Sequence, residues 1–318
     1  MKQVRNMIID ADTGIDDALA ILYALKSPGI RVEGVTTVFG NIGVEQATDN
    51  TLRIIKLAGA PYEVPVAIGA EKPLKRGMPE FATHVHGRNG IGDADIPASD
   101  QRPLEERADD FILRKSKELA GELIIVTLGR LTNVAQAVLK DPGLCERIKQ
   151  VYVMGGAVGV PGNVTPVSEA NIWGDPEAAD VVFSSGLPVT MVGLDVTMKT
   201  LLTGSHLDRL DRLRHDGNGA IVDFIRESHR YYFEFYRSSN AFIDSAPIHD
   251  PLTVLVAEDP SLVTTRLMKV SVVCDSELCA GMTAADLRRH PLAGSNIRVC
   301  TDVDEGLAVD RLLSPFVS

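Results

Sequence analysis

The chain has 318 residues, of which 45% are hydrophobic and 24% are charged, and its formal net charge is −11 at pH 7. This length is enough to bury a sizeable core, and the composition is typical of a globular protein in water. The acidic balance argues against DNA, RNA or another polyanion as a partner, and no apolar run approaches the ~20 residues of a membrane span.

Short apolar runs rich in β-branched residues alternate with amphipathic segments along the first part of the chain. Strands are predicted at Val4–Ile9, Val32–Phe39, Pro65–Ile68, Leu123–Thr127, Gln150–Met154 and Pro188–Val192. Helices are predicted at Asp16–Lys26, Val44–Ala58, Leu104–Leu119, Leu131–Leu139 and Pro176–Ser184. This alternation predicts a Rossmann-like α/β fold, in which helices flank both faces of a mostly parallel central sheet.

The later part of the chain has a different pattern. Thr200–Leu213 and Ala220–Tyr236 are predicted to be additional C-terminal helices. Two irregular segments, Ala70–Arg102 and Gly155–Gly174, are long for loops inside a domain, and loops of that length are usually functional or disordered. Because no repeat, low-complexity tract or linker interrupts the chain, we expect a single domain over residues 1–318.

The cysteines and the N-terminus bear on the cellular compartment. The four cysteines have no metal-type spacing and are expected to be reduced thiols. Residues 1–5 lead directly into an apolar strand, without the features of an export signal. We therefore expect a cytoplasmic protein.

The strongest chemical signal is the segment Asp10-Ala11-Asp12-Thr13-Gly14-Ile15-Asp16-Asp17. It follows the first predicted strand, and ligands of open parallel sheets bind outside the carboxyl ends of the strands. Its carboxylates repel one another, and a helix N-terminus supplies only about half a positive charge. A hard divalent cation bound by oxygens is the natural counter-charge. The spacing excludes an EF-hand loop, because Gly14 stands where a ligand is required.

Two other interpretations of this segment stay open. Asp16 and Asp17 would cap a helix while Asp10 and Asp12 lie in a solvated loop. Alternatively, Asp10-Ala11-Asp12-Thr13 resembles the first motif of haloacid-dehalogenase-type magnesium phosphohydrolases, with Asp10 as nucleophile and Asp12 as general acid/base. No convincing downstream lysine or acidic pair supports the second alternative.

The same segment, read from the strand to Ala20, resembles the signature of the inosine-uridine-preferring nucleoside hydrolase family, which usually has proline in place of Thr13. Further resemblances follow in the family's order over nearly the whole chain: Gly34–Asn41, His86–Gly90, Leu128–Asn133, Val153–Gly156, Gly162-Asn163, Ser168–Asn171, Asp175–Ala179, Gly193–Thr197 and Pro247–Pro251. The resemblance implies calcium-dependent hydrolysis of ribonucleosides to ribose and free base, with a broad or inosine/uridine preference.

The resemblance also implies roles for particular residues. Calcium would be held by the carboxylates of Asp12, Asp17 and Asp250 and by the backbone carbonyl of Leu128, where the family often has threonine. Asp12 would also orient the attacking water as general base, and Asp10 would support the loop from behind. The ribose hydroxyls would be bound by Asp16, Asn41, Asn163, Glu169 and Asn171.

The chemistry of N-glycosidic cleavage accounts for these residue types independently of the family. The sugar becomes oxocarbenium-like and positively charged in the transition state. Carboxylates and amides stabilise that charge and hold several hydroxyls at once. Calcium accepts six to eight oxygens, so it is able to gather protein, water and ribose ligands.

Several further residues are candidates for contact with the base. A lone histidine is more often structural, but His249 stands beside Asp250 and is expected to protonate the departing base. His86 either lines the base pocket or only belongs to its loop. Tyr232 and Tyr236 share a helix face and either contact the base or only pack. Asp175, directly before a proline, is interpreted as a helix N-cap.

The expected partner is a small-molecule ribonucleoside, and the resemblance alone implies a homotetramer or homodimer. A non-enzymatic alternative is a ribose- or nucleoside-binding protein that keeps the calcium site without chemistry. The set of acids together with His249 argues against it, because a sensor needs no general acid.

Overall fold

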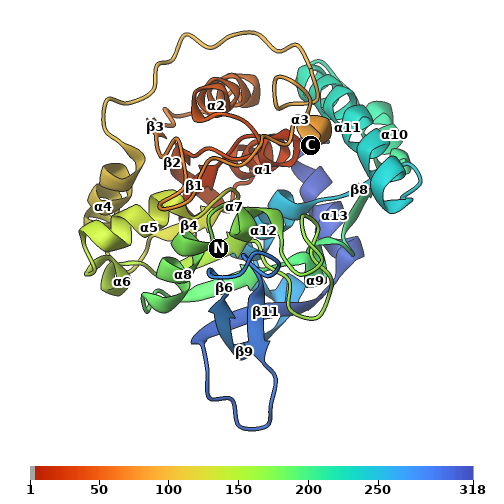
Figure 1. Ribbon diagram of the computed structural model, residues 1–318. Coiled ribbons are helices and arrows are strands. Elements are labelled where there is room, and N and C mark those ends of the chain that lie inside the picture. Colours follow the sequence, from red (N-terminus) through yellow and green to blue (C-terminus); the bar gives the residue numbers. More distant parts are fainter. Residues whose placement is uncertain (1–3, 318) are drawn as a thin grey trace.

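The computed structural model describes residues 4–317 (Figure 1). Residues 1–3, on which part of the argument about an export signal rests, and residue 318 lie outside the described residues. The centre of the fold is a nine-stranded sheet in the order β10-β9-β11-β6-β5-β4-β1-β2-β3. Its strands are β1 (Arg5–Ala11), β2 (Ile30–Thr37), β3 (Val66–Ile68), β4 (Ile124–Thr127), β5 (Gln150–Met154), β6 (Val189–Val192), β9 (Val263–Val272), β10 (Thr283–Asp286) and β11 (Ser295–Val303).

The sheet is mostly parallel, as the sequence predicts. All neighbours from β11 to β3 pair in parallel, whereas β9 pairs antiparallel with β10 and β11. Strand β1 lies between β2 and β4, and its residues from Met7 to Ala11 are all buried. This explains its unbroken apolar run, because a central strand of a covered sheet has no solvent face.

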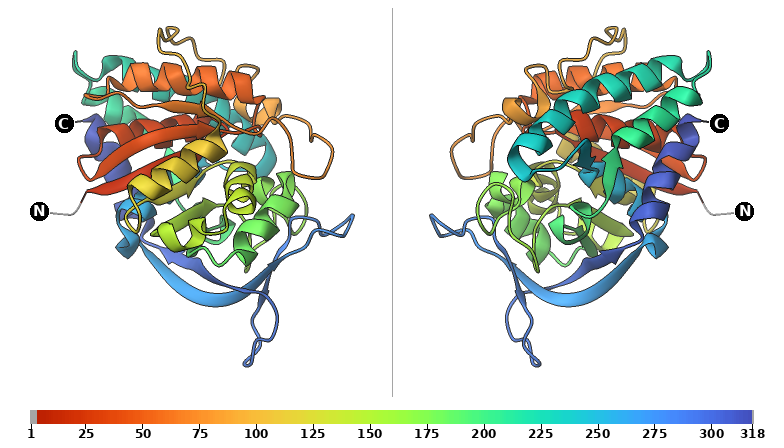
Figure 2. Two further views of the ribbon diagram at one scale, coloured as in Figure 1. Left: turned by 90° about the vertical axis from the view of Figure 1, so that its left-hand side faces the viewer. Right: turned by 90° about the vertical axis from the view of Figure 1, so that its right-hand side faces the viewer.

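Helices cover both faces of the sheet, and the buried side chains divide into two large clusters accordingly (Figure 2). One face carries α1 (Ile15–Lys26), α2 (Val44–Ala58), α11 (Gly219–Asn240), α12 (His249–Glu258) and α13 (Glu305–Leu313). The other carries α4 (Ala108–Glu118), α5 (Thr132–Lys140), α6 (Leu144–Arg147) and α8 (Pro176–Ser184). The α/β class and the additional C-terminal helices are therefore confirmed.

Two helix predictions are wrong at their N-terminal ends. The segment predicted as one helix from Thr200 begins instead with β7 (Leu201–Thr203), which pairs with β8 (Ser245–Pro247), and α10 (Gly204–Arg212) follows. The Thr203 side chain caps α10 by accepting a hydrogen bond from the backbone of His206, so the helix cannot start earlier.

The helix predicted from Leu104 begins only at Ala108. The backbone N–H of Leu104 donates to the carbonyl of Val66 at 2.7 Å, which continues the sheet edge beyond β3. Because Leu104 is extended and bonded to a strand, it cannot belong to the helix. Local helix propensity takes no account of such a tertiary contact.

The strands identified from the sequence end at Val192, and those beyond it were not identified. Strands β9, β10 and β11 form an antiparallel extension, and their connecting loops project from the body of the molecule (Figure 2). Strand β9 is half exposed over much of its length. Such strands lack the unbroken apolar run on which the other strand predictions rest.

The two long irregular segments are fastened to the body at several points. The first contains α3 (Thr83–His86), which lies beside α11 (Figure 1), and Tyr231 Oη donates to the carbonyl of Thr83 at 3.2 Å. The second contains α7 (Ala170–Gly174). The Asp195 carboxylate, next to β6 in α9 (Leu194–Thr197), accepts hydrogen bonds from the backbone N–H groups of Val158 and Gly159.

All four cysteines lie in the described part of the chain and are free thiols, in agreement with the expectation. Within residues 4–317, none of the helices combines the length and apolar character that crossing a membrane requires.

The buried Asp175 carboxylate confirms the predicted N-cap. It accepts hydrogen bonds from the backbone of Ala178 (3.1 Å) and Leu74 (2.9 Å) and from Thr132 Oγ1 (2.7 Å). Asp175→Ala should lower the free energy of unfolding by about 2–4 kcal/mol, because a cap is lost and buried donors are left unpaired. Urea denaturation measures this change. The matched control, Asp180→Ala on the exposed face of the same helix, should change it by less than about 0.5 kcal/mol. Equal effects of the two variants would contradict the structural role.

Candidate active site

The candidate residues meet at the carboxyl edge of the central strands. Asp10 belongs to the end of β1 and Asp12 follows it directly, while Leu128 follows β4. Asp16 and Asp17 lie in the first turn of α1, and Asp250 lies in the first turn of α12. Asn41 lies between β2 and α2, Glu169 and Asn171 lie at the start of α7, and Tyr232 and Tyr236 are on α11. This edge is where open parallel sheets bind ligands.

The tightest acidic cluster consists of Asp16, Asp17 and Asp250. One carboxylate oxygen from each lies within 4.8 Å of the others, and all three side chains are buried. Asp17 Oδ2 accepts a hydrogen bond from the backbone N–H of Gly14 at 2.8 Å, so Asp17 also helps to cap α1. Its other oxygen, Oδ1, is buried without a hydrogen-bond partner. Capping therefore explains one oxygen of Asp17 and leaves the other free for a ligand.

Asp12 is fully buried and adjoins this cluster, where Asp17 is its strongest charged influence and the Asn41 side chain contacts both carboxylates. Its Oδ2 accepts hydrogen bonds from the backbone N–H of Asn41 and from Arg130 Nη1, both at 2.7 Å. The Asn41 side chain reaches both carboxylates, at 3.3 Å to Asp12 Oδ1 and 3.2 Å to Asp17 Oδ2. The solvated-loop interpretation is wrong for Asp12, because the carboxylate is buried and its Oδ2 accepts two hydrogen bonds.

Asp10 supports the site from behind. Its Oδ1 accepts hydrogen bonds from Thr36 Oγ1 and from Asn133 Nδ2, the latter at 2.7 Å. Asn133 also donates to the carbonyl of Thr37 and accepts from the backbone N–H of Ala70. Asp10 thus fixes the ends of two strands and the following loops through Oδ1, and it is not a member of the tight cluster.

Glu169 and Asn171 line the same edge from α7. The Glu169 carboxylate accepts hydrogen bonds from the backbone N–H groups of Asn171, Ile172 and Gly156. Asn171 Nδ2 donates to the carbonyl of Leu128 at 2.6 Å. The Leu128 carbonyl thereby points toward the polar interior of the site.

Asn163 is placed differently from the other candidates. Its side chain is exposed, and Oδ1 accepts a hydrogen bond from the backbone N–H of Ala170 at 3.0 Å. This bond joins the irregular segment to the first residue of α7. Asn163 therefore lies outside the buried cluster, although it is close to Glu169 in the sequence.

His86 closes over the start of α1. Its Nδ1 accepts a hydrogen bond from the backbone N–H of Ile15 at 3.1 Å, and its ring centroid lies 5.7 Å from that of Tyr232. A Cβ atom at Gly14 would come within 2.5 Å of His86 Nδ1 and 2.7 Å of Asn41 Nδ2. A side chain at that position would separate the histidine from the acidic cluster, so this close approach requires glycine.

His249 is linked to the acidic cluster by two tyrosines. Its Nε2 hydrogen bonds with Tyr236 Oη at 2.8 Å, and Nδ1 hydrogen bonds with Thr197 Oγ1 at 2.8 Å. The rings of Tyr232 and Tyr236 meet edge-on at 5.0 Å, and burial together with the nearby Asp16 carboxylate raises the pKa of Tyr232. The two tyrosines thus lie between Asp16 and His249, and Tyr236 hydrogen bonds with the imidazole.

Burial dominates the electrostatics of the site. It raises the pKa of Asp16 to about 7 and that of Asp17 to about 6. Burial, reinforced by the neighbouring carboxylates, raises the pKa of Asp250 well above its usual range. Desolvation lowers the pKa of His249 to about 4 and that of His86 to about 3, so both imidazoles are neutral at pH 7.

These features fit a hard cation. The donors are carboxylate and carbonyl oxygens, one of them an unpartnered buried oxygen of Asp17. The raised pKa values show that the carboxylates are under-compensated by the protein alone. The sequence-based set of Asp12, Asp17 and Asp250 differs from the tight cluster in one member, since Asp16 lies in the cluster while Asp12 adjoins it and is held by Arg130 and Asn41.

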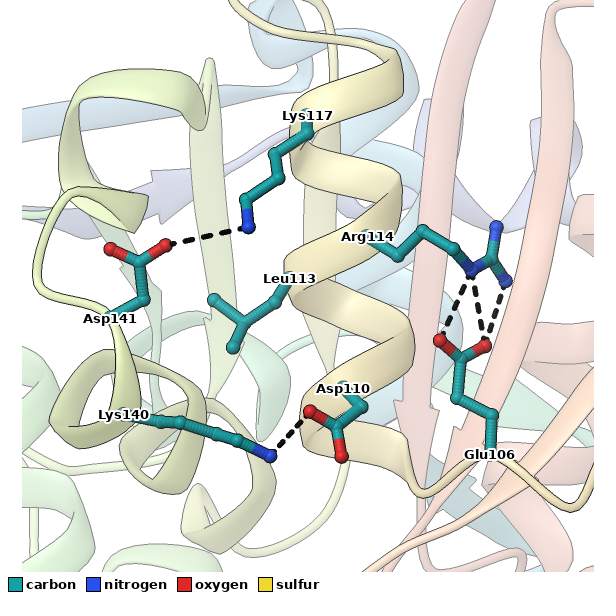
Figure 3. Close-up of a pocket in the computed structure, with 7 residues that line it drawn as sticks. All are labelled: Glu106, Asp110, Leu113, Arg114, Lys117, Lys140 and Asp141. Atoms are coloured by element: carbon teal, nitrogen blue, oxygen red, sulfur yellow. Dashed lines mark hydrogen bonds and ion pairs between the residues drawn. The ribbon is translucent and has the colours of Figure 1, made fainter.

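A surface hollow between α4 and α5 is unrelated to this chemistry (Figure 3). Its charged side chains pair with each other, as in the 2.8 Å contact between Arg114 and Glu106 and the 4.0 Å contact between Lys117 and Asp141. None of the candidate residues lines it. Mutually compensated surface charges do not make a catalytic site.

Sequence reasoning missed Arg130, Asn133 and Thr197 as parts of the site. Arg130 and Asn133 belong to a motif that carries the family resemblance, and Thr197 belongs to another, so the signal was present in the chain. Their roles depend on partners far away in sequence, such as Asp12 for Arg130 and His249 for Thr197.

Comparison with known proteins identifies the family. The model of the inosine-uridine preferring nucleoside hydrolase family matches residues 7–310. Uridine nucleosidase 1 of Arabidopsis thaliana is 39% identical over 290 residues, which cover 91% of this chain and 84% of that protein.

Solved structures agree with this family. A plant nucleoside hydrolase superposes with a TM-score of 0.92 at 35% identity, covering 99% of both chains. A purine-preferring ribonucleoside hydrolase from Gardnerella vaginalis gives 0.91 at 36% identity, covering 98% of both chains. The phosphohydrolase and the non-catalytic binding protein are thereby set aside. The chain belongs to the inosine-uridine preferring nucleoside hydrolase family, and it is a ribonucleoside hydrolase.

Proposed function

We propose that this hydrolase depends on calcium and acts on a broad set of ribonucleosides or prefers inosine and uridine. The observation that carries the proposal is the buried cluster of Asp16, Asp17 and Asp250, whose oxygens lie within 4.8 Å of one another. Enzymes of this family use a metal ion. Calcium suits this site because every candidate donor is an oxygen and several of them are carboxylates.

The residues proposed to hold calcium are Asp12, Asp17, Asp250 and, through its carbonyl, Leu128. When bound, the ion would offset the carboxylates and supply coordination positions for a water molecule and for ribose hydroxyls. The burial of these carboxylates and the unpartnered Asp17 Oδ1 support the assignment. Asp10 is proposed to keep the loop in place through Thr36 and Asn133.

Asp12 is proposed as the general base that orients and deprotonates the attacking water. Its Oδ2 is engaged by Arg130 and Asn41, whereas Oδ1 has only the 3.3 Å contact with the Asn41 amide. Burial, followed by repulsion from Asp17, raises the pKa of Asp12 well above its usual range. Bound calcium would lower this pKa and weaken the base, which is tolerable if the nucleobase departs first and the water then attacks a highly electrophilic sugar.

The ribose is proposed to contact Asp16, Asn41, Asn163, Glu169 and Asn171. Four of these lie at the buried edge, where negative and polar groups stabilise a developing positive charge on the sugar. Support for Asn163 rests on the family resemblance, because the side chain is exposed and holds the backbone of Ala170.

His249 is proposed to protonate the departing base together with Tyr236. Burial lowers the pKa of His249 to about 4, so the neutral imidazole is proposed to act together with its hydrogen-bonded neighbour Tyr236. The 2.8 Å bond between Tyr236 Oη and His249 Nε2 joins this pair. His86 and Tyr232, in ring contact with each other, are proposed to line the base pocket.

The comparisons support either base class. One relative is named a uridine nucleosidase, and a structure of similar identity is named purine-preferring. A small-molecule ribonucleoside is the proposed partner in either case. A cytoplasmic location and a homotetramer or homodimer are proposed from the sequence and the family resemblance.

Removal of calcium tests the proposal directly. Purified protein treated with a chelator should release no free base from inosine or uridine, and added calcium should restore the release. Asp12→Asn, assayed with calcium present, should lower kcat by at least about 10²-fold, because the base and a ligand charge are lost. Full turnover in a verified metal-free sample would overturn calcium dependence, while a normal kcat for the variant would place the base elsewhere.

The raised carboxyl pKa values predict how calcium changes stability with pH. A folded-state pKa of about 7 for Asp16 or 6 for Asp17, against 3.8 ordinarily, stabilises the metal-free fold at low pH. That contribution is lost as the pH rises through the folded-state pKa. Calcium competes with these protons, so the calcium-induced increase in Tm should grow from pH 5 to about 7.5.

Differences in Tm between calcium-loaded and metal-free samples isolate this effect. The buried His86 and His249 have lowered pKa values and act in the opposite direction in both samples. Their contribution cancels in the difference. A calcium-induced shift that stays constant or shrinks as the pH rises would contradict the prediction.

His249→Ala separates activation of the base from activation of the sugar. A nucleobase needs a proton to leave, whereas the 4-nitrophenolate of an aryl riboside leaves as a stable anion. The variant should lose roughly 10²–10⁴-fold in kcat on inosine and keep nearly full activity on 4-nitrophenyl riboside. His290→Ala, at an exposed position, is the matched control. Equal losses on both substrates would show that His249 holds Asp250 or the fold instead.

A further inference from the structure

One cation is buried among the carboxylates of the site. The Arg130 side chain is 5% exposed, and Nη1 lies 2.7 Å from Oδ2 of the fully buried Asp12. The same nitrogen donates to Asn171 Oδ1 at 3.1 Å. A guanidinium is always charged and only donates hydrogen bonds, so it holds its two partners with fixed polarity.

The fold makes room for this guanidinium at two glycines. A Cβ atom at Gly174 would lie 2.3 Å from Arg130 Nε. A Cβ atom at Gly40 would lie 2.7 Å from Arg130 Nη1 and 1.8 Å from Asp12 Oδ2. Side chains at either position would displace the ion pair. The pair is therefore a built part of the site and differs from a surface contact.

Arg130 leaves Asp12 with a single free oxygen. Oδ2 already accepts from Arg130 and from the backbone N–H of Asn41 at 2.7 Å each. Oδ1 has only the 3.3 Å contact with the Asn41 side chain. The two oxygens of Asp12 therefore differ in their hydrogen bonding.

Through Asn171, Arg130 also acts on the Leu128 carbonyl. Because Arg130 can only donate, the Asn171 amide must present its oxygen to Arg130 and its NH₂ group to the other side. That NH₂ group donates to the Leu128 carbonyl at 2.6 Å. One guanidinium thus orients two of the proposed calcium ligands, Asp12 directly and Leu128 through one amide.

We propose that Arg130 is a positioning residue that limits Asp12 to one ligand oxygen and weakens the affinity of the site for its cation. This inference rests on the proposed function, because it concerns the proposed cation site. The positive charge of Arg130 opposes a dication, and its hydrogen bond occupies an oxygen that would otherwise be available as a ligand. The free Oδ1 is thereby reserved for a single ligand contact.

Variants at Arg130 separate its charge from its hydrogen bond. Arg130→Met removes both, Arg130→Gln keeps a donor without the charge, and Arg130→Lys keeps the charge. Arg76→Met is the matched control, because Arg76 holds a single carboxylate, that of Glu177, outside the site.

Metal binding is measured with calcium alone by calorimetry and with terbium alone by luminescence lifetimes in H₂O and D₂O, which count bound waters. Arg130→Met should lower the calcium Kd by about tenfold or more, because a repelling charge is removed. It should also lose about one terbium-bound water, because Asp12 gains a second ligand oxygen. Arg130→Gln should have a lower calcium Kd than wild type but the same number of terbium-bound waters. Arg130→Lys should keep the wild-type Kd within about threefold.

The outcomes distinguish this inference from the proposed function. Absence of calcium binding by the wild-type protein would overturn the cation site and this inference with it. Suppose that the wild-type protein binds calcium normally, but the Kd of both Arg130→Met and Arg130→Gln is unchanged or higher. That result would overturn the role of Arg130 alone. If Arg130→Met does not fold, the Gln and Lys variants still decide the question, and thermal melting of the metal-free proteins identifies that case.

Discussion

Mutual repulsion among buried carboxylates is the constraint on which the rest of the site depends. Asp10, Asp12, Asp16, Asp17 and Asp250 all lie buried near the carboxyl edge of the sheet. Taking one carboxylate out of water is costly, and several together raise one another's pKa values. Such a group persists in a folded protein only where other parts of the structure compensate for it.

The compensation is divided among several parts of the fold. Asp10 is held by Thr36 and Asn133, and Asp12 is held by Arg130 and the backbone of Asn41. The dipole at the N-terminus of α1 and the hydrogen bond from the Gly14 N–H stabilise the Asp17 carboxylate. The tight cluster at the starts of α1 and α12 remains uncompensated. Its excess negative charge is what makes a bound cation the natural completion of the site.

The fold was predictable where burial on both faces of the sheet requires an unbroken apolar run in the sequence. Strand β1 and its parallel neighbours are covered on both faces, so their apolar runs identify them. The segment that starts at Thr200 and the strands β9 to β11 escaped prediction, since their conformations are fixed by partners distant in the chain. Leu201, for example, is a strand residue because it pairs with Pro247.

The site was predictable to the extent that its residues are contiguous or lie in family motifs. The acidic segment after β1 indicates a cation without any knowledge of tertiary structure. The neutral state of His249 and the ion pair of Arg130 were not predictable, because both arise from burial next to residues far away in sequence. Asp16 illustrates the same limit, since its closeness to Asp250 depends on how α1 and α12 meet.

The pairing of β6 with β11 has a consequence for how this chain is made. Strand β6 spans Val189–Val192 and is wholly buried, but the strand that covers its outer edge begins only at Ser295. Throughout the synthesis of the intervening segment, a nascent chain presents an open apolar parallel edge, the kind of surface that recruits other strands. Ribosome-bound or truncated chains that end before Ser295 therefore keep this edge of β6 open to aggregation, and β11 closes it by pairing with β6.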